Sequence, residues 1–205
     1  ETAVAVATDA IDRLHTTAET HHRVMVLEVM GRFAGWIALE SAIAGGADVA
    51  LIPEIPYDIN KVVDAINKRK NDGKKFSIVV VSEGAIPKNG EASTYVANIG
   101  EGTGIMTRCT TLGYVQRGGT PVAYDRVLSS KYGAKAMELA MEGKFGVLTI
   151  YKNGRIDSVS LEDVVGNNKQ IGAVEGGTKD SNVRFVTMDD ELVKTAKDLG
   201  ICLGD

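Results

Sequence analysis

The chain has 205 residues, of which 44% are hydrophobic and 24% are charged. That composition is sufficient to bury a core, and it excludes a disordered or fibrous chain. The 23 Lys and Arg residues are outnumbered by 27 Asp and Glu residues, which leaves a formal net charge of −4. This charge argues against general nucleic-acid binding, although a local group of arginines can still bind a phosphate.

The N-terminal half alternates helix and strand patterns. Apolar residues fall on one stripe over residues 1–19, which predicts a helix. The apolar run 24–27, which ends at Glu28-Val29 with almost no polar alternation, predicts a strand buried on both faces, as in a parallel sheet. Further patterns predict helices at 36–44 and 60–70 and strands at 47–52 and 76–81. This order predicts an α/β fold in which helices sandwich a parallel sheet with right-handed crossovers.

The C-terminal half is less regular. The glycine-dense span 84–104 indicates a loop and a helix start, and it precedes a predicted strand at 108–115 and a predicted helix at 123–142. Asn153-Gly154 separates two apolar runs, 145–151 and 155–159, and is typical of a β-hairpin. A loop is expected at 166–180 and a last amphipathic helix at 189–199.

Membrane and secreted proteins are excluded by simple counts. The longest uncharged apolar stretch, 33–39, is far shorter than the roughly 20 residues that cross a bilayer. Two cysteines, Cys109 and Cys202, make no disulfide framework, so a reducing cytoplasm is expected. The first residues contain neither a basic region nor a methionine, which predicts no secretory signal and a start that has been cut.

Polar residues follow the predicted strands at the points where they end. Ligands of open parallel sheets bind at these carboxyl ends, so a polar and anionic ligand is expected there. Gly31 would let backbone N–H groups approach the ligand, and the following helix start favours negative charge. The four strand-end segments are Met30-Gly31-Arg32, Pro53-Glu54, Ser82-Glu83-Gly84 and Gln116-Arg117-Gly118-Gly119.

Two further arginines stand at the other end of their strands. Arg23 and Arg108 each precede a strand-end arginine by nine positions, and nine strand residues span roughly 30 Å. The two arginines are therefore surface charges, or serve a second site, or serve the ligand of a neighbouring subunit. Tyr114 is placed either to face a ligand or to pack on the strand. No histidine has metal-ligand spacing and no paired acids suit Mg²⁺, so no metal site is predicted.

The sequence resembles 6-phosphofructokinase over nearly its whole length, most densely from Arg23 to Gly143. The resemblance is carried by the strand-end segments above, and most specifically by residues 112–121, Leu-Gly-Tyr-Val-Gln-Arg-Gly-Gly-Thr-Pro. It implies a Rossmann-like lobe of a glycolytic kinase that transfers the γ-phosphoryl group of ATP, with Mg²⁺, to the 1-hydroxyl of fructose 6-phosphate. It also implies a cytoplasmic homo-oligomer, a dimer or tetramer, with shared active sites.

The resemblance implies roles for eight residues. Met30, Gly31 and Arg32 resemble the substrate loop, with Arg32 as the catalytic residue that stabilises the transferring phosphoryl group. Glu83 resembles a carboxylate that accepts bonds from sugar hydroxyls, and Arg117 resembles a substrate arginine. The other three match residues around the 6-phosphate: Arg23 and Arg108 resemble a pair supplied by an adjacent subunit, and Tyr114 stands where many members have a histidine.

The resemblance also suggests a domain plan. Residues 1–117 with about 185–205 correspond to the fructose 6-phosphate lobe, and about 118–165 to a segment that packs with a nucleotide lobe. That lobe, with its catalytic aspartate, would precede residue 1. The donor, ATP or pyrophosphate, therefore stays open, as does a non-catalytic sugar-phosphate sensor. Where bacterial members form a basic effector pocket, this chain departs from the pattern with His15, Asp48, Asp72 and Lys74.

Overall fold

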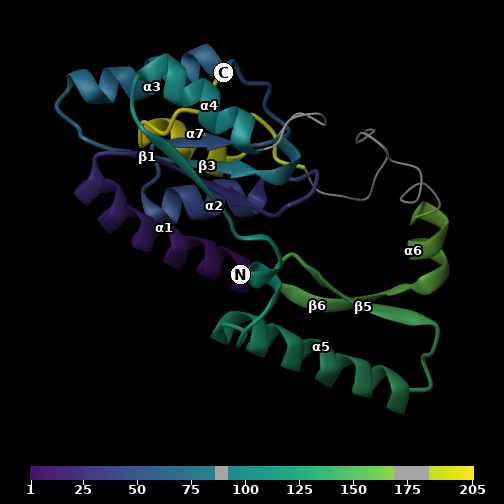
Figure 1. The fold of residues 1–205 in the computed structure, drawn as a ribbon. Helices are drawn as coiled ribbons and strands as arrows, with labels where there is room; N and C mark the ends of the chain where they lie inside the picture. The colour runs from purple at the N-terminus through teal and green to yellow at the C-terminus, as the bar shows by residue number, and fades with distance from the viewer. Residues whose placement is uncertain (86–91, 169–184) are drawn as a thin grey trace. The chain divides into compact units, whose positions relative to one another are not determined.

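The computed structural model describes residues 1–85, 92–168 and 185–205 (Figure 1). The chain divides into two compact units, a larger one of residues 2–119 and 184–205 and a smaller one of residues 120–183 with residue 1. Each unit is described by itself. Among the described residues, no helix combines the length and the apolar content needed to cross a bilayer.

A four-stranded parallel sheet forms the centre of the larger unit, in the order β2-β3-β1-β4. This confirms the predicted fold class. Because β1 lies between β3 and β4, the loop after β1 is flanked on both sides by residues that follow other strands. The strands are β1 (Val24–Val29), β2 (Val49–Leu51), β3 (Ser77–Ser82) and β4 (Thr107–Thr111).

Helices cover both faces of this sheet (Figure 1). Alternate residues of β1 enter opposite layers: Leu27 packs in the first layer and Val26 in the second. This two-sided burial explains why the β1 sequence shows no polar alternation. The first layer contains α1 (Thr2–His21), α2 (Trp36–Gly45) and α7 (Glu191–Asp198), and the second contains α3 (Ile59–Asn71) and α4 (Ala92–Thr103).

The strand predicted at 108–115 ends early. The structure replaces its second half with a 3-10 helix, η2 (Gly113–Arg117). Gly113 adopts a φ of 51°, which no strand residue has, and the Leu112 N–H donates to the Glu28 carbonyl as the last link to β1. A similar short helix, η1 (Glu83–Ala85), follows β3. The residues expected at two strand ends therefore lie on short helices above the sheet.

The smaller unit pairs one long helix with a hairpin. α5 (Ala123–Met141) contacts β5 (Val147–Lys152) and β6 (Arg155–Ser160), which are antiparallel. Asn153 and Gly154 have φ values of 50° and 80°, as a type I′ turn requires, so the predicted hairpin is confirmed. α6 (Leu161–Asn168) was not predicted, and most of the loop expected at 166–180 lies outside the described residues.

Candidate active site

A cavity of about 230 Å³ opens at the carboxyl ends of the central strands of the larger unit. It is smaller than the roughly 300–1,000 Å³ of typical ligand pockets, which suits part of a small ligand. Three segments far apart in the sequence meet there: the loop after β1, η1 and η2. The lining residues are Ala3, Met30, Gly31, Arg32, Ile37, Glu83, Gln116 and Arg117.

Residues 30–32, called the 30–32 loop below, are held from both sides. On one side, the Met30 N–H donates to Gln116 Oε1 at 2.7 Å. On the other, Glu83 Oε1 accepts the N–H of Arg32 at 2.8 Å and that of Gly31 at 3.3 Å. All three backbone donors of the loop are thus engaged by side chains from η1 and η2, so the loop has one fixed position.

The backbone of this loop is unusual. Arg32 has a φ of 54°, a left-handed conformation that costs a non-glycine residue about 1–3 kcal/mol. The bond from its N–H to Glu83 helps to hold it. A Cβ atom at Gly84 would lie 1.9 Å from the Arg32 carbonyl oxygen, and one at Gly31 would lie 2.5 Å from the Ala34 carbonyl oxygen. Both glycines are therefore required by close backbone contacts.

The charges of the cavity favour an anion. Arg32 and Arg117 are exposed, and within the described residues neither forms an ion pair. Each guanidinium instead lies over an aromatic ring, Arg32 at 5.2 Å from the Phe33 centroid and Arg117 at 5.5 Å from the Tyr114 centroid. Glu83 contributes the one carboxylate among the lining residues that the structure describes. Two free guanidinium groups against one engaged carboxylate suit phosphate oxygens.

Arg23 and Arg108 lie at the amino ends of their strands, whereas the cavity opens at the carboxyl ends. Arg23 directly precedes β1, and Arg108 is the second residue of β4, in register with Met25. Neither is among the described residues that line the cavity. The six residues of β1 rise about 20 Å, so the strand itself is shorter than the nine residues behind the 30 Å estimate. Arg108 and Arg117 are likewise not separated by nine strand residues, because β4 has five residues and η2 follows it.

Glu54 does not join the site, contrary to the strand-end expectation. Its carboxylate accepts the Gly35 N–H at 2.9 and 3.0 Å and the Val186 N–H at 3.0 Å. Glu54 therefore fixes the start of α2 and the chain before α7. Tyr114 is 81% exposed and supports Arg117 through its ring, but it is not among the described lining residues.

Sequence reasoning assigned no role to two buried polar residues at this edge. Gln116 Nε2 and Ser82 Oγ are both buried, and among the described residues neither atom has a hydrogen-bond partner. Gln116 lies within the strand-end segment Gln-Arg-Gly-Gly, so the sequence did place it near the predicted site. Its specific role depends on the hydrogen bond to Met30, which the sequence does not show.

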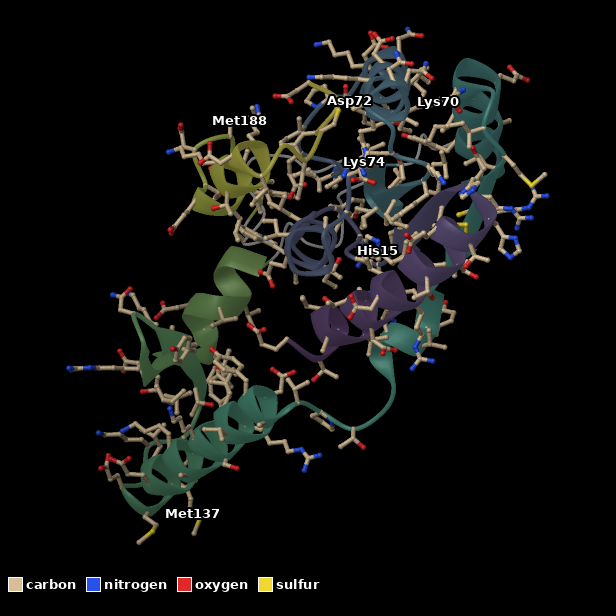
Figure 2. All side chains as sticks on the ribbon, turned by 90° about the vertical axis from the view of Figure 1, so that its left-hand side faces the viewer. His15, Lys70, Asp72, Lys74, Met137 and Met188 are labelled. Atoms are coloured by element: carbon tan, nitrogen blue, oxygen red, sulfur yellow. The ribbon has the colours of Figure 1, made fainter. Side chains whose placement is uncertain are left out.

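A separate polar cluster surrounds Asp48, just before β2. The Asp48 carboxylate accepts the Ile78 N–H at 2.8 Å and pairs with Arg69 at 2.7 Å. Burial nevertheless raises the pKa of Asp48, against the lowering effects of the Ile78 bond and of Arg69, His15 and Lys74. Figure 2 shows Lys74 lying between Asp72 and His15, and His15 Nε2 lies 2.8 Å from the Gly45 carbonyl oxygen.

The fold and the cavity define a class of protein, an α/β protein with an arginine-lined cavity at the carboxyl ends of a parallel sheet. The family model for phosphofructokinase matches residues 1–140. The chain belongs to the phosphofructokinase family.

Two curated relatives are 47% identical to the chain and are matched over all of it. They are ATP-dependent 6-phosphofructokinase 2 of Clostridium perfringens and ATP-dependent 6-phosphofructokinase 3 of Bacteroides thetaiotaomicron. The chain spans 57% of the length of each relative.

Solved structures share the fold. Phosphofructokinase of Pichia pastoris in the T-state has a TM-score of 0.71 and 34% identity, over 83% of this chain and 20% of that chain. Pyrophosphate-dependent phosphofructokinase of Marinobacter aquaeolei also has a TM-score of 0.71, with 23% identity, over 97% of this chain and 54% of that chain. The second likeness concerns the fold alone.

Proposed function

We propose that this chain forms the fructose 6-phosphate site of an ATP-dependent 6-phosphofructokinase that acts in cytoplasmic glycolysis. The observation that carries the proposal is the cavity lined by Arg117 and by the 30–32 loop, which includes Arg32 and is held by Glu83 and Gln116. The ATP-dependent names of the 47% identical relatives support ATP, rather than pyrophosphate, as the donor.

Each residue of the cavity has a chemical task in this proposal. Arg117 binds substrate oxygens, and Arg32 stabilises the negative charge of the transferring phosphoryl group, as fixed cations do in phosphoryl transfer. Glu83 already uses Oε1 for the loop, so Oε2 is the atom that accepts a sugar hydroxyl. The Glu83 carboxylate then links the position of the sugar to that of the 30–32 loop. Met30 and Gly31 supply backbone atoms that line the sugar site.

The domain plan and the metal follow from the same proposal. The larger unit binds the sugar phosphate, and the segment from about 118 to 165 packs with a nucleotide-binding part. The 78% exposure of Met141 and the 77% exposure of Phe145, both in the smaller unit, support such packing. Figure 2 shows Met137 on the same helix, α5. Among the described residues, no three His, Cys, Asp or Glu side chains gather as a metal site, so no Mg²⁺ ligand is assigned to this chain.

A titration tests the sugar site. Fructose 6-phosphate should bind to the 205-residue chain, as followed by calorimetry, and unphosphorylated fructose should not. Arg117→Ala should weaken binding about ten- to hundredfold, because a charge-assisted bond is lost. Arg13→Ala is the matched control, since Arg13 is exposed on α1 and pairs only with the neighbouring Asp9 among the described residues. Equal weakening by both variants would contradict the proposal.

We also propose that Arg23 and Arg108 complete the phosphate site of a two-fold-related copy, with Tyr114 beside it. Arg23 and Arg108 lie at the amino ends of the strands, away from the cavity of their own chain, which supports a role at another copy's site. Arg108→Ala and Arg117→Ala chains should each bind fructose 6-phosphate weakly, whereas a mixture with exchanged subunits should regain one intact site per mixed dimer. No recovery after demonstrated exchange would refute a shared site.

A further inference from the structure

Gln116 is the most buried polar side chain among the described residues that line the cavity. Its exposed fraction is 2%, and it stands on η2 next to Arg117. One half of its amide is used, because Oε1 accepts the Met30 N–H at 2.7 Å. The other half is not, because Nε2 is buried without a partner among the described residues.

The orientation of this amide is fixed by its partner. Oxygen and nitrogen of a glutamine side chain are told apart by the groups that they meet. The partner of Gln116 is a backbone N–H, so a flipped amide would set two donors against each other. The NH₂ group is therefore the end left without a bond. Buried donors of this kind are rare in folded proteins, because each one loses its hydrogen bond to water.

The surroundings of Gln116 indicate what its NH₂ group binds. The cavity that this residue lines also presents the guanidinium groups of Arg32 and Arg117 and the carboxylate of Glu83. Cations and an amide donor together suit phosphate and hydroxyl oxygens, and the carboxylate suits a hydroxyl proton. A sugar phosphate offers both kinds of group.

We propose that Gln116 positions the 30–32 loop through Oε1 and donates from Nε2 to an oxygen of the bound sugar phosphate. This inference rests on the proposed function. A single rigid side chain then joins the ligand to the Met30 backbone, so an occupied site holds the loop more firmly than an empty one. Hydrogen bonds at the two ends of one polar group strengthen each other in this way.

Two substitutions separate the two tasks. Gln116→Glu keeps an oxygen that accepts the Met30 N–H but replaces the NH₂ donor with a second oxygen that repels an anion. Gln116→Met keeps the length of the side chain and removes both bonds. Asn71→Asp is the matched control for the added charge, because Asn71 is the last residue of α3 and is exposed, outside the described cavity lining.

The experiment measures two quantities on the 205-residue chain and its variants. The first is the hydrogen-exchange protection of the Met30 amide by NMR, and the second is fructose 6-phosphate affinity by calorimetry. Gln116→Glu should retain the protection and lose about ten- to hundredfold in affinity. Gln116→Met should lose both, and Asn71→Asp should lose neither. Amide spectra of each variant verify that the fold persists.

Each contrary result has its own meaning. Unchanged affinity in Gln116→Glu would refute the donor role, and unchanged Met30 protection in Gln116→Met would refute the positioning role. If the unsubstituted chain bound no fructose 6-phosphate, the proposed function would fail and the donor role with it. The exchange of the Met30 amide would still decide the positioning role.

Discussion

Asp48 and Gln116 are both polar side chains placed beside the sheet of the larger unit, but their hydrogen bonding differs. Asp48 has its carboxylate engaged by the Ile78 N–H and by Arg69. Gln116, a residue of the cavity lining, bonds to Met30 with one end only, and its buried NH₂ group has no partner among the described residues. A polar group satisfied within the chain stabilises the fold, whereas one left partly unsatisfied beside a cavity indicates a ligand. The two regions should therefore respond to substitution in opposite ways.

The largest effect is expected at the close contact that shapes the 30–32 loop. Gly84→Ala would place a Cβ atom 1.9 Å from the Arg32 carbonyl oxygen, so the loop must move. Fructose 6-phosphate affinity should fall by more than about a hundredfold, because the backbone and Arg32 are displaced together. Gly133→Ala is the control, since no described atom lies within 4 Å of its Cβ position. A Gly84→Ala chain with normal affinity would show that fructose 6-phosphate binding does not depend on the position of the 30–32 loop.

The next effect concerns stability rather than binding. Asp48→Ala leaves the Ile78 N–H without its acceptor and should lower the free energy of unfolding by about 1–3 kcal/mol. Asp48→Asn should lower it less, because an amide oxygen still accepts that N–H. Urea denaturation measures both. Fructose 6-phosphate affinity should stay unchanged, and a parallel loss of affinity would remove the distinction between the two regions.

The same contrast shows which features the sequence could predict. β1 and β3 were predicted because their apolar runs show almost no polar alternation, and the hairpin because Asn153-Gly154 has one favoured turn. The strand predicted through Val115 was wrong, since its apolar pattern continues past a glycine whose φ is positive. Apolar patterns over a few residues predict that a strand is present, but they do not show the residue at which the strand ends and a turn begins.

The candidate site was predicted in part, for a related reason. The strand-end rule selected Arg32, Glu83 and Arg117, and the structure brings these three to one cavity. It also selected Glu54, whose oxygens are taken by backbone groups 19 and 132 positions away. It gave Gln116 no separate role, because the bond to Met30 spans 86 positions. Hydrogen bonds between distant segments decide which strand-end residues are free for a ligand.

The smallest effect is a pH dependence of stability at Asp48. Burial raises the pKa of this carboxyl above its ordinary value of 3.8, in spite of the Ile78 bond and the nearby charges of Arg69, His15 and Lys74. As the pH rises above 3.8, the unfolded chain releases the Asp48 proton first, so the folded state holds more protons. Its stability then falls with pH until the raised pKa is passed, and is level above it. Asp48→Asn has no such proton. The free energy of unfolding of the unsubstituted chain, relative to that of Asp48→Asn, should therefore decrease from pH 3.5 upward, by less than about 1.4 kcal/mol per pH unit. Urea denaturation of both proteins across this range measures the difference. An increase with pH would mean that Arg69 and the Ile78 N–H outweigh burial, and that Asp48 is stabilised in its charged form.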